Sequence, residues 1–346
     1  MTVALDDIKR EVQDSVTDGT VTIVGSGISA EAGLPTMSEL ANTLLATLPL
    51  NPALADDWEP IADCLGRMDL ESALDSVDAS SPLLAEIVQT VAKEVIVRER
   101  EVICRMATGA VTLPCTALVE RLRRVTRRAV IITTNYDRLL EAAVEHAGIP
   151  IDTSFIGDYF GRFDPTGSKQ LFQSLPRLRN RRVAAVTRPH VVIYKPHGSL
   201  DWYSVDDAPM RSLINLDAPR LIITPGRSKH ERGYERPFDH HRALGNTAID
   251  AASSLLVLGY GFNDSHLQTH LGPKLREGTR ALVLTRTLSE KARLEIAAAP
   301  QMLALERAHG TPSGNAATTA YWRGETVLFD GIDLWDLDTL IKEALP

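Results

Sequence analysis

Four polar corners hold the residue types that could do chemistry in this sequence, and each one follows an apolar run. They read GSGISAEAGLP (25–35), TTNYD (133–137), KPHGSLDW (195–202) and GYGFND (259–264). Short apolar runs rich in β-branched residues are typical of buried strands. Parallel α/β sheets bind their ligands at the carboxyl ends of such strands. The sequence therefore predicts that glycines, an amide, carboxylates and a histidine meet at one edge of a sheet.

Each corner also has a purely structural interpretation. Asn135 and Asp137 could cap the helix that follows them, which is the commonest role of such residues. His197 could be a buried histidine whose hydrogen bonds the protein satisfies. Four such corners in strand order favour a shared ligand site over four separate structural roles.

The first corner has the spacing of a dinucleotide fingerprint. Gly25, Gly27 and Ala30 match the G-x-G-x-x-A variant, in which glycines let the backbone approach a phosphate and free N–H groups meet its charge. The residues that follow are helical in pattern and offer no strand ending in an acid for the ribose. This absence disfavours an ordinary dehydrogenase and leaves a structural turn as the alternative.

The elements that would position these corners alternate along the chain. Strands are predicted within 20–29, 128–137, 190–200, 219–226, 254–261 and 280–286, with helical patterns between most of them. This alternation predicts an α/β fold with a parallel sheet covered by helices on both faces. The simplest interpretation is one domain over 1–346 with a helical insertion subdomain at about 38–125. Residues 155–189 have little periodicity and are predicted to be irregular, with a role left open.

Composition and charge exclude several classes of protein. The net charge of −8 and pI of about 5.6 give no indication of a nucleic-acid or membrane partner. Cys64, Cys104 and Cys115 form no C-x-x-C pair, which favours a reduced, cytoplasmic setting and argues against disulfides and structural zinc. His266 and His270 are spaced like zinc ligands, but no glutamate lies between them, so no metal is expected.

Together, GSGISAEAGLP, TTNYD, HGSLDW and GYGFND resemble the ordered motifs of the sirtuin (silent information regulator) superfamily, most closely its bacterial anti-phage defence branch. The resemblance spans residues 21–264 and implies a Rossmann-like sheet that binds NAD as a substrate. It implies that Asn135 positions a water or the nicotinamide ribose and that Asp137 holds the carboxamide. His197 would bond the ribose hydroxyls and act as the base.

The resemblance also implies a wider set of NAD-contacting residues. The first corner would line the pyrophosphate and nicotinamide pocket, and the last corner would lie near the adenosine end. These residues are Gly25, Ser26, Gly27, Ile28, Ser29, Gly33, Leu34, Pro35, Thr134, Tyr136, Gly259, Tyr260, Asn263 and Asp264.

Two departures from the family pattern bear on the reaction. Deacylating sirtuins carry a four-cysteine zinc module between the histidine and the late glycine corner, whereas residues 199–258 contain no cysteine. The family stretch G-[IL]-P-x-[FW]-R reads GLPTMS at 33–38, without the aromatic and arginine residues. The absent cysteines weaken the case for protein deacylation.

The predicted function is therefore NAD+ hydrolysis to ADP-ribose and nicotinamide, as a regulated effector of abortive-infection defence. An unregulated NAD hydrolase would poison its host, so control is expected through homo-oligomerisation or a separate partner. The resemblance suggests a HerA-type ATPase or a short Argonaute as that partner. The alternatives are a protein deacylase or ADP-ribosyltransferase, and an NAD- or ADP-ribose-binding regulatory module without turnover.

Overall fold

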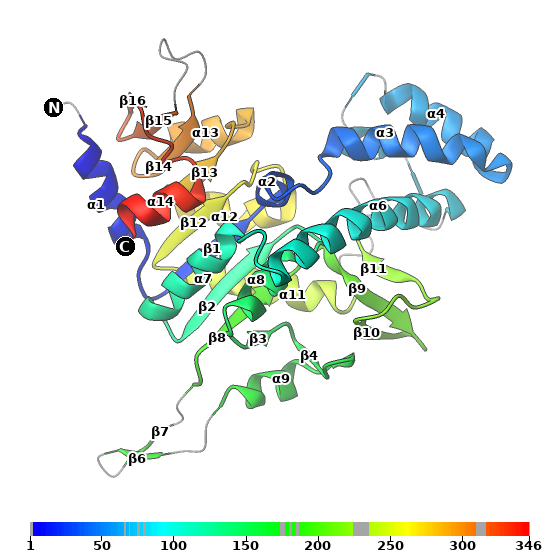
Figure 1. The fold of residues 1–346 in the computed structure, drawn as a ribbon, viewed down its shortest axis with the longest axis horizontal. Coiled ribbons are helices and arrows are strands. Elements are labelled where there is room, and N and C mark those ends of the chain that lie inside the picture. The colour runs from blue at the N-terminus through cyan, green and yellow to red at the C-terminus, as the bar shows by residue number, and fades with distance from the viewer. Residues whose placement is uncertain are drawn as a thin grey trace.

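The computed structural model describes residues 3–65, 67–68, 70–74, 77–78, 81–173, 177–179, 182–184, 187–223, 235–308 and 316–345. Within these residues the main sheet has nine strands, namely β1 (Thr20–Val24), β2 (Arg128–Thr133), β3 (Ile151–Asp152), β8 (His190–Tyr194), β12 (Ser254–Leu258), β13 (Arg280–Thr285), β14 (Leu303–Arg307), β15 (Ala317–Trp322) and β16 (Glu325–Asp330). They lie in the order β16-β15-β14-β13-β12-β1-β2-β8-β3 (Figure 1). The strands from β14 to β3 pair in parallel, and β15 and β16 extend the sheet as an antiparallel hairpin.

Alternate residues of the parallel strands point into two separate cores. On one face, side chains such as Ile131 and Leu256 pack with α1 (Leu5–Ser15), α7 (Pro114–Val125), α8 (Leu139–His146) and α14 (Leu337–Ala344). On the other face, side chains such as Val130 and Val257 pack with α11 (Phe238–Ala251), α12 (Ser265–Arg276) and α13 (Glu290–Ala298). The predicted α/β sheet with helices on both faces is confirmed.

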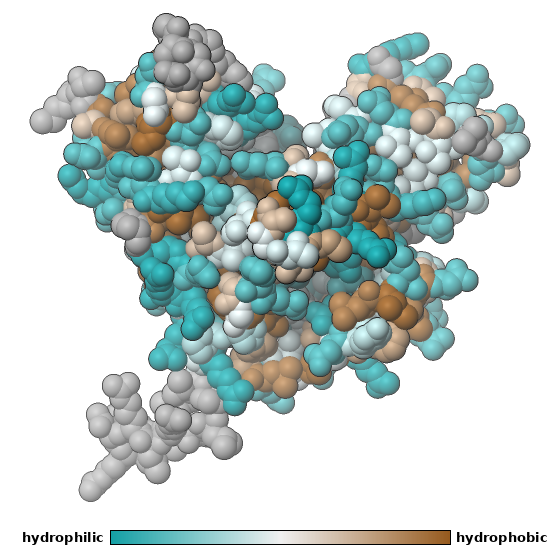
Figure 2. Space-filling view, viewed as in Figure 1, coloured by the Kyte–Doolittle hydropathy of each residue, from teal (hydrophilic) through white to brown (hydrophobic). Residues whose placement is uncertain are grey.

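The chain between β1 and α7 is helical and includes a lobe beside the sheet. Its helices are α2 (Ser26–Glu31), α3 (Met37–Thr47), α4 (Ala55–Leu65), α5 (Leu70–Leu74) and the 26-residue α6 (Pro82–Ala107), with short 3₁₀ turns at Leu48–Leu50 and Pro52–Leu54. In Figures 1 and 2, α3 and α4 are separated from the C-terminal strands by a notch, and α2 lies at its base. None of the helices in the described residues is both long and apolar enough to cross a membrane.

A capping box begins α3 and so fixes the entry into this lobe. The Thr36 hydroxyl oxygen accepts the Glu39 N–H at 3.3 Å, and Glu39 Oε2 accepts the Thr36 N–H at 2.8 Å. Two backbone N–H groups at the helix start are thereby satisfied. The buried side chains of Leu40 and Leu44 then hold α3 against α6.

A second, antiparallel sheet differs from the sequence expectation. Its strands are β4 (Phe155–Ile156), β5 (Phe160–Phe163), β9 (Gly198–Val205), β10 (Ala208–Ser212) and β11 (Arg220–Ile222), in the order β11-β9-β10-β5-β4. The predicted strand 190–200 is confirmed over β8, but the chain turns at Gly198 (φ +83°) and continues as β9 in the second sheet. The predicted strand 219–226 contributes β11, which pairs antiparallel with β9 instead of joining the parallel sheet. Residues 224–226 lie outside the described part.

The stretch 155–189 also has more regular structure than its pattern predicted. It contains β4, β5, α9 (Pro165–Leu171) and a two-stranded pair, β6 (Arg177–Arg179) with β7 (Arg182–Ala184). Residues 174–176, 180–181 and 185–186 lie outside the described part of the chain.

His241 joins the two sheets and is a buried structural histidine. Its ring lies 4.7 Å from the ring of the buried Trp202 in β9, and its Nδ1 accepts the Lys195 N–H at 3.2 Å. His241 lies in the first turn of α11, which begins at Phe238. Trp202 and Trp322 are both buried, at 1% and 7% exposed.

Acidification should destabilise the fold through His241. Burial lowers the pKa of this histidine from 6.5 to about 3, with smaller effects of His240 and Lys195 in the same direction. Below pH 6.5 the unfolded chain takes up a proton that the folded chain refuses, so about 2 kcal/mol of stability is lost between pH 7 and pH 5. The amide oxygen of His241→Asn can still accept the Lys195 N–H, but the side chain does not titrate. Its free energy of unfolding, measured with urea, should therefore fall by about 2 kcal/mol less than that of the wild type between pH 7 and pH 5. Equal losses in both proteins would contradict the assignment.

Candidate active site

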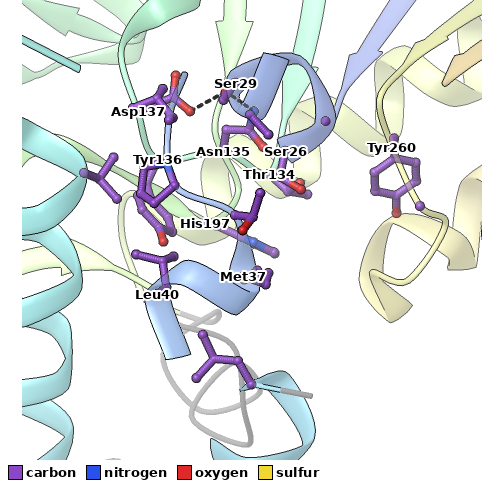
Figure 3. A pocket seen from close by; sticks show the side chains of 18 of the residues that line it. Ser26, Ser29, Met37, Leu40, Thr134, Asn135, Tyr136, Asp137, His197 and Tyr260 are labelled. Atoms are coloured by element: carbon purple, nitrogen blue, oxygen red, sulfur yellow. Dashed lines mark hydrogen bonds between the residues drawn. The ribbon is translucent and has the colours of Figure 1, made fainter. Parts of the chain in front are cut away.

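Four strands of the main sheet end at one cavity. The chain continues from β1 to β2 on one side and later returns to β12 on the other, so β1 marks the switch point of the sheet. Open α/β sheets bind ligands at such points. A cavity of about 390 Å³ lies there, walled by the residues that follow β1, β2, β8 and β12 (Figure 3). Leu40 of α3, Leu70 of α5 and Val95 of α6 add apolar wall.

Three hydrogen-bonded side chains form one wall of this cavity. The Ser29 hydroxyl donates to Asp137 Oδ2 at 2.7 Å and accepts from Asn135 Nδ2 at 2.9 Å (Figure 3). Asn135 Nδ2 also donates to the Gly25 carbonyl at 3.0 Å. A carbonyl can only accept, so this contact fixes the orientation of the amide. Both hydrogen bonds of this side chain are donated by Nδ2, so Oδ1 is the atom that can accept a hydrogen bond from a ligand or a water.

The corner after β2 is held in place by its own side chains. Thr133 Oγ1 donates to the Val24 carbonyl at 2.9 Å and accepts the Asn135 N–H at 3.1 Å. Asp137 Oδ1 accepts the Leu139 N–H at 3.1 Å, at the start of α8. Asp137 thus serves the helix start with one oxygen and the cavity wall with the other.

His197 is held by a carboxylate from the last corner. Its Nε2 lies 2.8 Å from Asp264 Oδ2, and the two side chains are 13% and 4% exposed. Asp264 Oδ1 accepts the Leu267 N–H at 2.8 Å and caps α12. The contact has the distance of an ion pair but not the alignment of a hydrogen bond. For a neutral imidazole, the favoured tautomer places the proton on the nitrogen nearest the carboxylate. The other nitrogen, Nδ1, then holds the lone pair that can act as a base.

A buried lysine supports the Asn135–Asp137 corner from below. Lys195 is fully buried, and its Nζ donates to the Asp137 carbonyl oxygen and, at 2.9 Å, to Glu141 Oε1. It thereby ties the end of β8 to the start of α8. Lys195 was not among the predicted site residues, although a lysine that directly follows a mostly apolar strand is a signal that it has a buried partner.

The glycines of the first and last corners meet at a close backbone crossing. The Gly25 N–H donates to the Leu258 carbonyl at 2.9 Å, and the Gly27 N–H donates to the Gly259 carbonyl at 3.0 Å. A Cβ on Gly25 would come within 2.5 Å of the Gly259 carbonyl oxygen. The expectation that Gly25 and Gly27 offer free N–H groups to a phosphate therefore needs correction, because the protein itself uses both groups.

Most of the predicted NAD-contacting residues surround the cavity with the three catalytic candidates. Those that line it are Ser26, Gly27, Ser29, Leu34, Pro35, Thr134, Tyr136, Tyr260, Asn263 and Asp264. Four predicted residues do not line it. Gly25 and Gly259 form the crossing, Ile28 packs against the core beside the sheet, and Gly33 (φ +103°) follows α2.

Gly259→Ala should destabilise the protein by at least about 2 kcal/mol, because it combines backbone strain with a steric clash. Gly259 has φ +56°, and a Cβ there would lie 2.7 Å from the Ile28 backbone nitrogen. Gly324→Ala is a matched control, since Gly324 has φ +76° and nothing within 4 Å of its Cβ position. The difference between the free energies of unfolding of the two variants, measured with urea, gives the contribution of the steric clash at the backbone crossing. Equal destabilisation of the two variants would show that the contact between the corners is unimportant.

The two departures from the sirtuin pattern have clear structural counterparts. Met37 takes the place of the family's aromatic residue, lines the cavity and is 43% exposed. Between His197 and the last corner, the described residues form β9, β10, β11, α11 and β12. The described chain contains no group of three or more His, Cys, Asp or Glu side chains that could hold a metal ion.

Comparison with known proteins finds a family match over a part of the chain that includes the three catalytic candidates. Residues 129–298 match the family described as SIR2-like domain. Similar solved structures include a SIR2 homologue–NAD complex, at 12% identity and TM-score 0.42 over 88% of this chain and 89% of that chain. Sir2Tm bound to a propionylated peptide is 14% identical at TM-score 0.42, over 83% of this chain and 89% of that one. No curated protein sequence matches the chain.

Proposed function

We propose that this protein is an NAD+ hydrolase that cleaves the bond between nicotinamide and ribose. The observation that carries the proposal is the meeting of Asn135, Asp137 and His197 at one cavity, at the switch point of the sheet. The SIR2-like match over residues 129–298 supports NAD as the substrate. The reaction consumes NAD+ and water and yields ADP-ribose, nicotinamide and a proton.

Asn135 would orient the attacking water. Cleavage leaves the electron pair of the C1′–N bond on nicotinamide, which is a good leaving group, and develops positive charge on the ribose. The enzyme then has to hold the ribose and aim a water oxygen at C1′. The Asn135 amide is fixed by Gly25 and Ser29 and keeps Oδ1 as an acceptor for a water proton. An amide does this without titrating.

His197 would accept the proton, through Nδ1. Its Nε2 faces Asp264, which favours the tautomer with the Nδ1 lone pair available. His197 Nδ1 can take the proton either from the attacking water directly or from a ribose hydroxyl. Asp264 is thus a positioning residue, and we move it from the NAD-contacting set to this role.

Asp137 would hold the carboxamide of nicotinamide. Each carboxylate oxygen offers two acceptor sites, so Oδ2 can receive the Ser29 hydroxyl and still accept from a carboxamide N–H. Ser29 links Asp137 to Asn135, so recognition of the leaving group and orientation of water share one hydrogen-bonded unit. Hydrolysis is favoured over deacylation because residues 199–258, the interval in which deacylating sirtuins carry a four-cysteine zinc module, contain no cysteine.

The cellular role that fits this chemistry is NAD depletion in bacterial anti-phage defence. Such an enzyme needs control, which we assign to homo-oligomerisation or to a partner such as a HerA-type ATPase or a short Argonaute. Both the role and these partners rest on the sequence resemblance.

The proposal is tested by incubating the protein with NAD+, both purified alone and as the complex recovered from its host. Nicotinamide release should occur in at least one form and should fall by about 10²-fold or more in His197→Ala, in line with the loss of a general base. Full turnover in His197→Ala would overturn the assignment.

A further inference from the structure

The main sheet has one long open edge. Its last strand, the six-residue β16, pairs with β15, and in the described part of the chain no strand pairs with its outer side (Figure 1). The other edge strands of the two larger sheets are shorter, since β3 and β4 have two residues each and β11 has three. A long open edge presents unpaired N–H and carbonyl groups to the strand of another chain.

The edge strand β16 lacks the features with which proteins commonly protect an edge. Its sequence, ETVLFD, contains no proline and no lysine, and its charged residues, Glu325 and Asp330, stand at the two ends. Its pairing with β15 is regular over all six residues, without a bulge. At its centre, Leu328 is 52% exposed. A regular edge with an exposed apolar centre is a template for pairing with another strand.

The turn that leads into β16 determines which of its backbone groups face outward. Arg323 and Gly324 form a two-residue turn and have φ +53° and +76°, and positive φ at both positions is typical of a type I′ hairpin. In such a hairpin the two flanking residues, here Trp322 and Glu325, exchange hydrogen bonds with each other. The following pairs of an antiparallel ladder then alternate between hydrogen-bonded and non-hydrogen-bonded pairs.

This alternation leaves the backbone groups at the centre of β16 facing the open edge. Alternate residues from Glu325 onward bond to β15, and the Gly331 N–H continues this pattern by donating to the Ala316 carbonyl at 2.7 Å. Thr326 and Leu328 belong to the other set. Their N–H and carbonyl groups therefore point away from β15, toward the side that a further strand would occupy.

A second copy of β16 fits this edge when the two strands run antiparallel about a two-fold axis at Leu328. Leu328 then lies opposite the same residue of the other copy, and Thr326 lies opposite Asp330. Outward-facing backbone groups thus meet outward-facing groups. Val327 lies opposite Phe329, so apolar side chains meet apolar ones and a hydroxyl meets a carboxylate.

Other registers of the same pairing fit less well. A shift by one residue would set outward-facing backbone groups against inward-facing ones, and in one direction it would also place Glu325 opposite Asp330. A shift by two residues leaves fewer residues paired and sets Leu328 opposite a polar residue. The strand is therefore complementary to itself in one register.

We propose that two copies of this protein associate through β16, antiparallel about a two-fold axis at Leu328, so that two nine-stranded sheets continue as one. The partner is a second copy because the side chains of β16 meet counterparts of matching polarity in their own sequence, as an isologous interface requires. β13, β14 and β15 separate β16 from the strands that end at the cavity, so the contact leaves the cavity open. The association holds whether or not the protein hydrolyses NAD.

The test is sedimentation velocity of the full chain over a concentration series. The wild type should form a dimer. Leu328→Pro removes an outward N–H from each copy and should raise the dimer Kd at least about tenfold, because two hydrogen bonds are lost per dimer. Leu328→Lys sets two like charges opposite each other and should have at least as large an effect. Leu294→Lys, at a 66% exposed position of α13, is the matched control and should leave the Kd unchanged.

A wild type that stays monomeric would overturn the proposal and leave the edge to a strand of another protein. A dimer whose Kd is unchanged in both Leu328→Pro and Leu328→Lys would overturn it as well, because the contact would then lie elsewhere on the molecule.

Cross-linking tests the register without weakening the interface. In a Cys64→Ser/Cys104→Ser background, Leu328→Cys should be joined to its counterpart by a short bis-maleimide, since opposite residues of paired strands have Cα atoms about 5 Å apart. Leu294→Cys in the same background is the control. Covalent dimer should form at least fivefold faster in Leu328→Cys, and equal rates in the two proteins would contradict the two-fold axis at Leu328.

Discussion

Asn135→Ala should lower the kcat for NAD+ hydrolysis by about 10²-fold or more, because the water that attacks C1′ is no longer oriented. The side chain makes two hydrogen bonds through Nδ2, to Gly25 and Ser29, so its removal also leaves the Gly25 carbonyl without this donor. The fold should lose about 1–3 kcal/mol of stability for that reason. Nicotinamide release and thermal unfolding should therefore be measured on the same samples.

Two further variants show whether the fall in kcat comes from the loss of water orientation or from a general loss of stability. Asn135→Asp keeps the shape but cannot donate to Gly25, so its activity should fall like that of Asn135→Ala. Asn51→Ala removes an asparagine that caps a 3₁₀ turn away from the cavity and should leave kcat within about twofold. Activity close to wild type in Asn135→Asp would contradict the assigned role.

Asp264→Asn should lower kcat by about 10²-fold or more while leaving KM within about threefold, because it acts through His197. The new amide N–H would face His197 Nε2, and the proton of the imidazole would then reside on Nδ1. The lone pair that we assign as the base is lost, although the ring keeps its place. The amide oxygen can still accept the Leu267 N–H, so the cap of α12 is kept.

The tautomer of His197 can be measured directly, and it would not change if Asp264 had only a structural role. The ¹⁵N shifts of His197 should report an Nε2–H tautomer in the wild type and an Nδ1–H tautomer in Asp264→Asn. An equal fall in kcat with an unchanged tautomer would show that Asp264 acts by shaping the cavity and not by orienting the base.

The hydrophobic pattern of the sequence was sufficient to predict the parallel sheet but did not predict the second, antiparallel sheet. β1, β8 and β12 are buried at every residue, so each appears in the sequence as a short run of mostly apolar residues. β9 follows β8 after only three residues, and its turn depends on Gly198, where a Cβ would lie 2.0 Å from the Leu221 carbonyl oxygen. A contact so distant in the chain leaves no local pattern. β14 was also missed, because it is short and only four residues separate it from the end of α13.

The site was predictable as a set of corners but not as a network of contacts. Strand ends that carry Asn135, Asp137 and His197 could be recognised one by one, and parallel pairing brings them together. The pairing of His197 with Asp264 and the burial of Lys195 depend on side-chain packing across the sheet. The N–H groups of Gly25 and Gly27 are used by the crossing with β12, which no spacing of residues within the first corner reveals.

The most direct test of the central claim is to follow NAD+ in ¹⁸O-labelled water with the protein in its active assembly. The account predicts equal amounts of nicotinamide and ADP-ribose, with one ¹⁸O at C1′ of the ribose. Tight binding of NAD+ without any nicotinamide release, in the isolated protein and in the assembly alike, would contradict it.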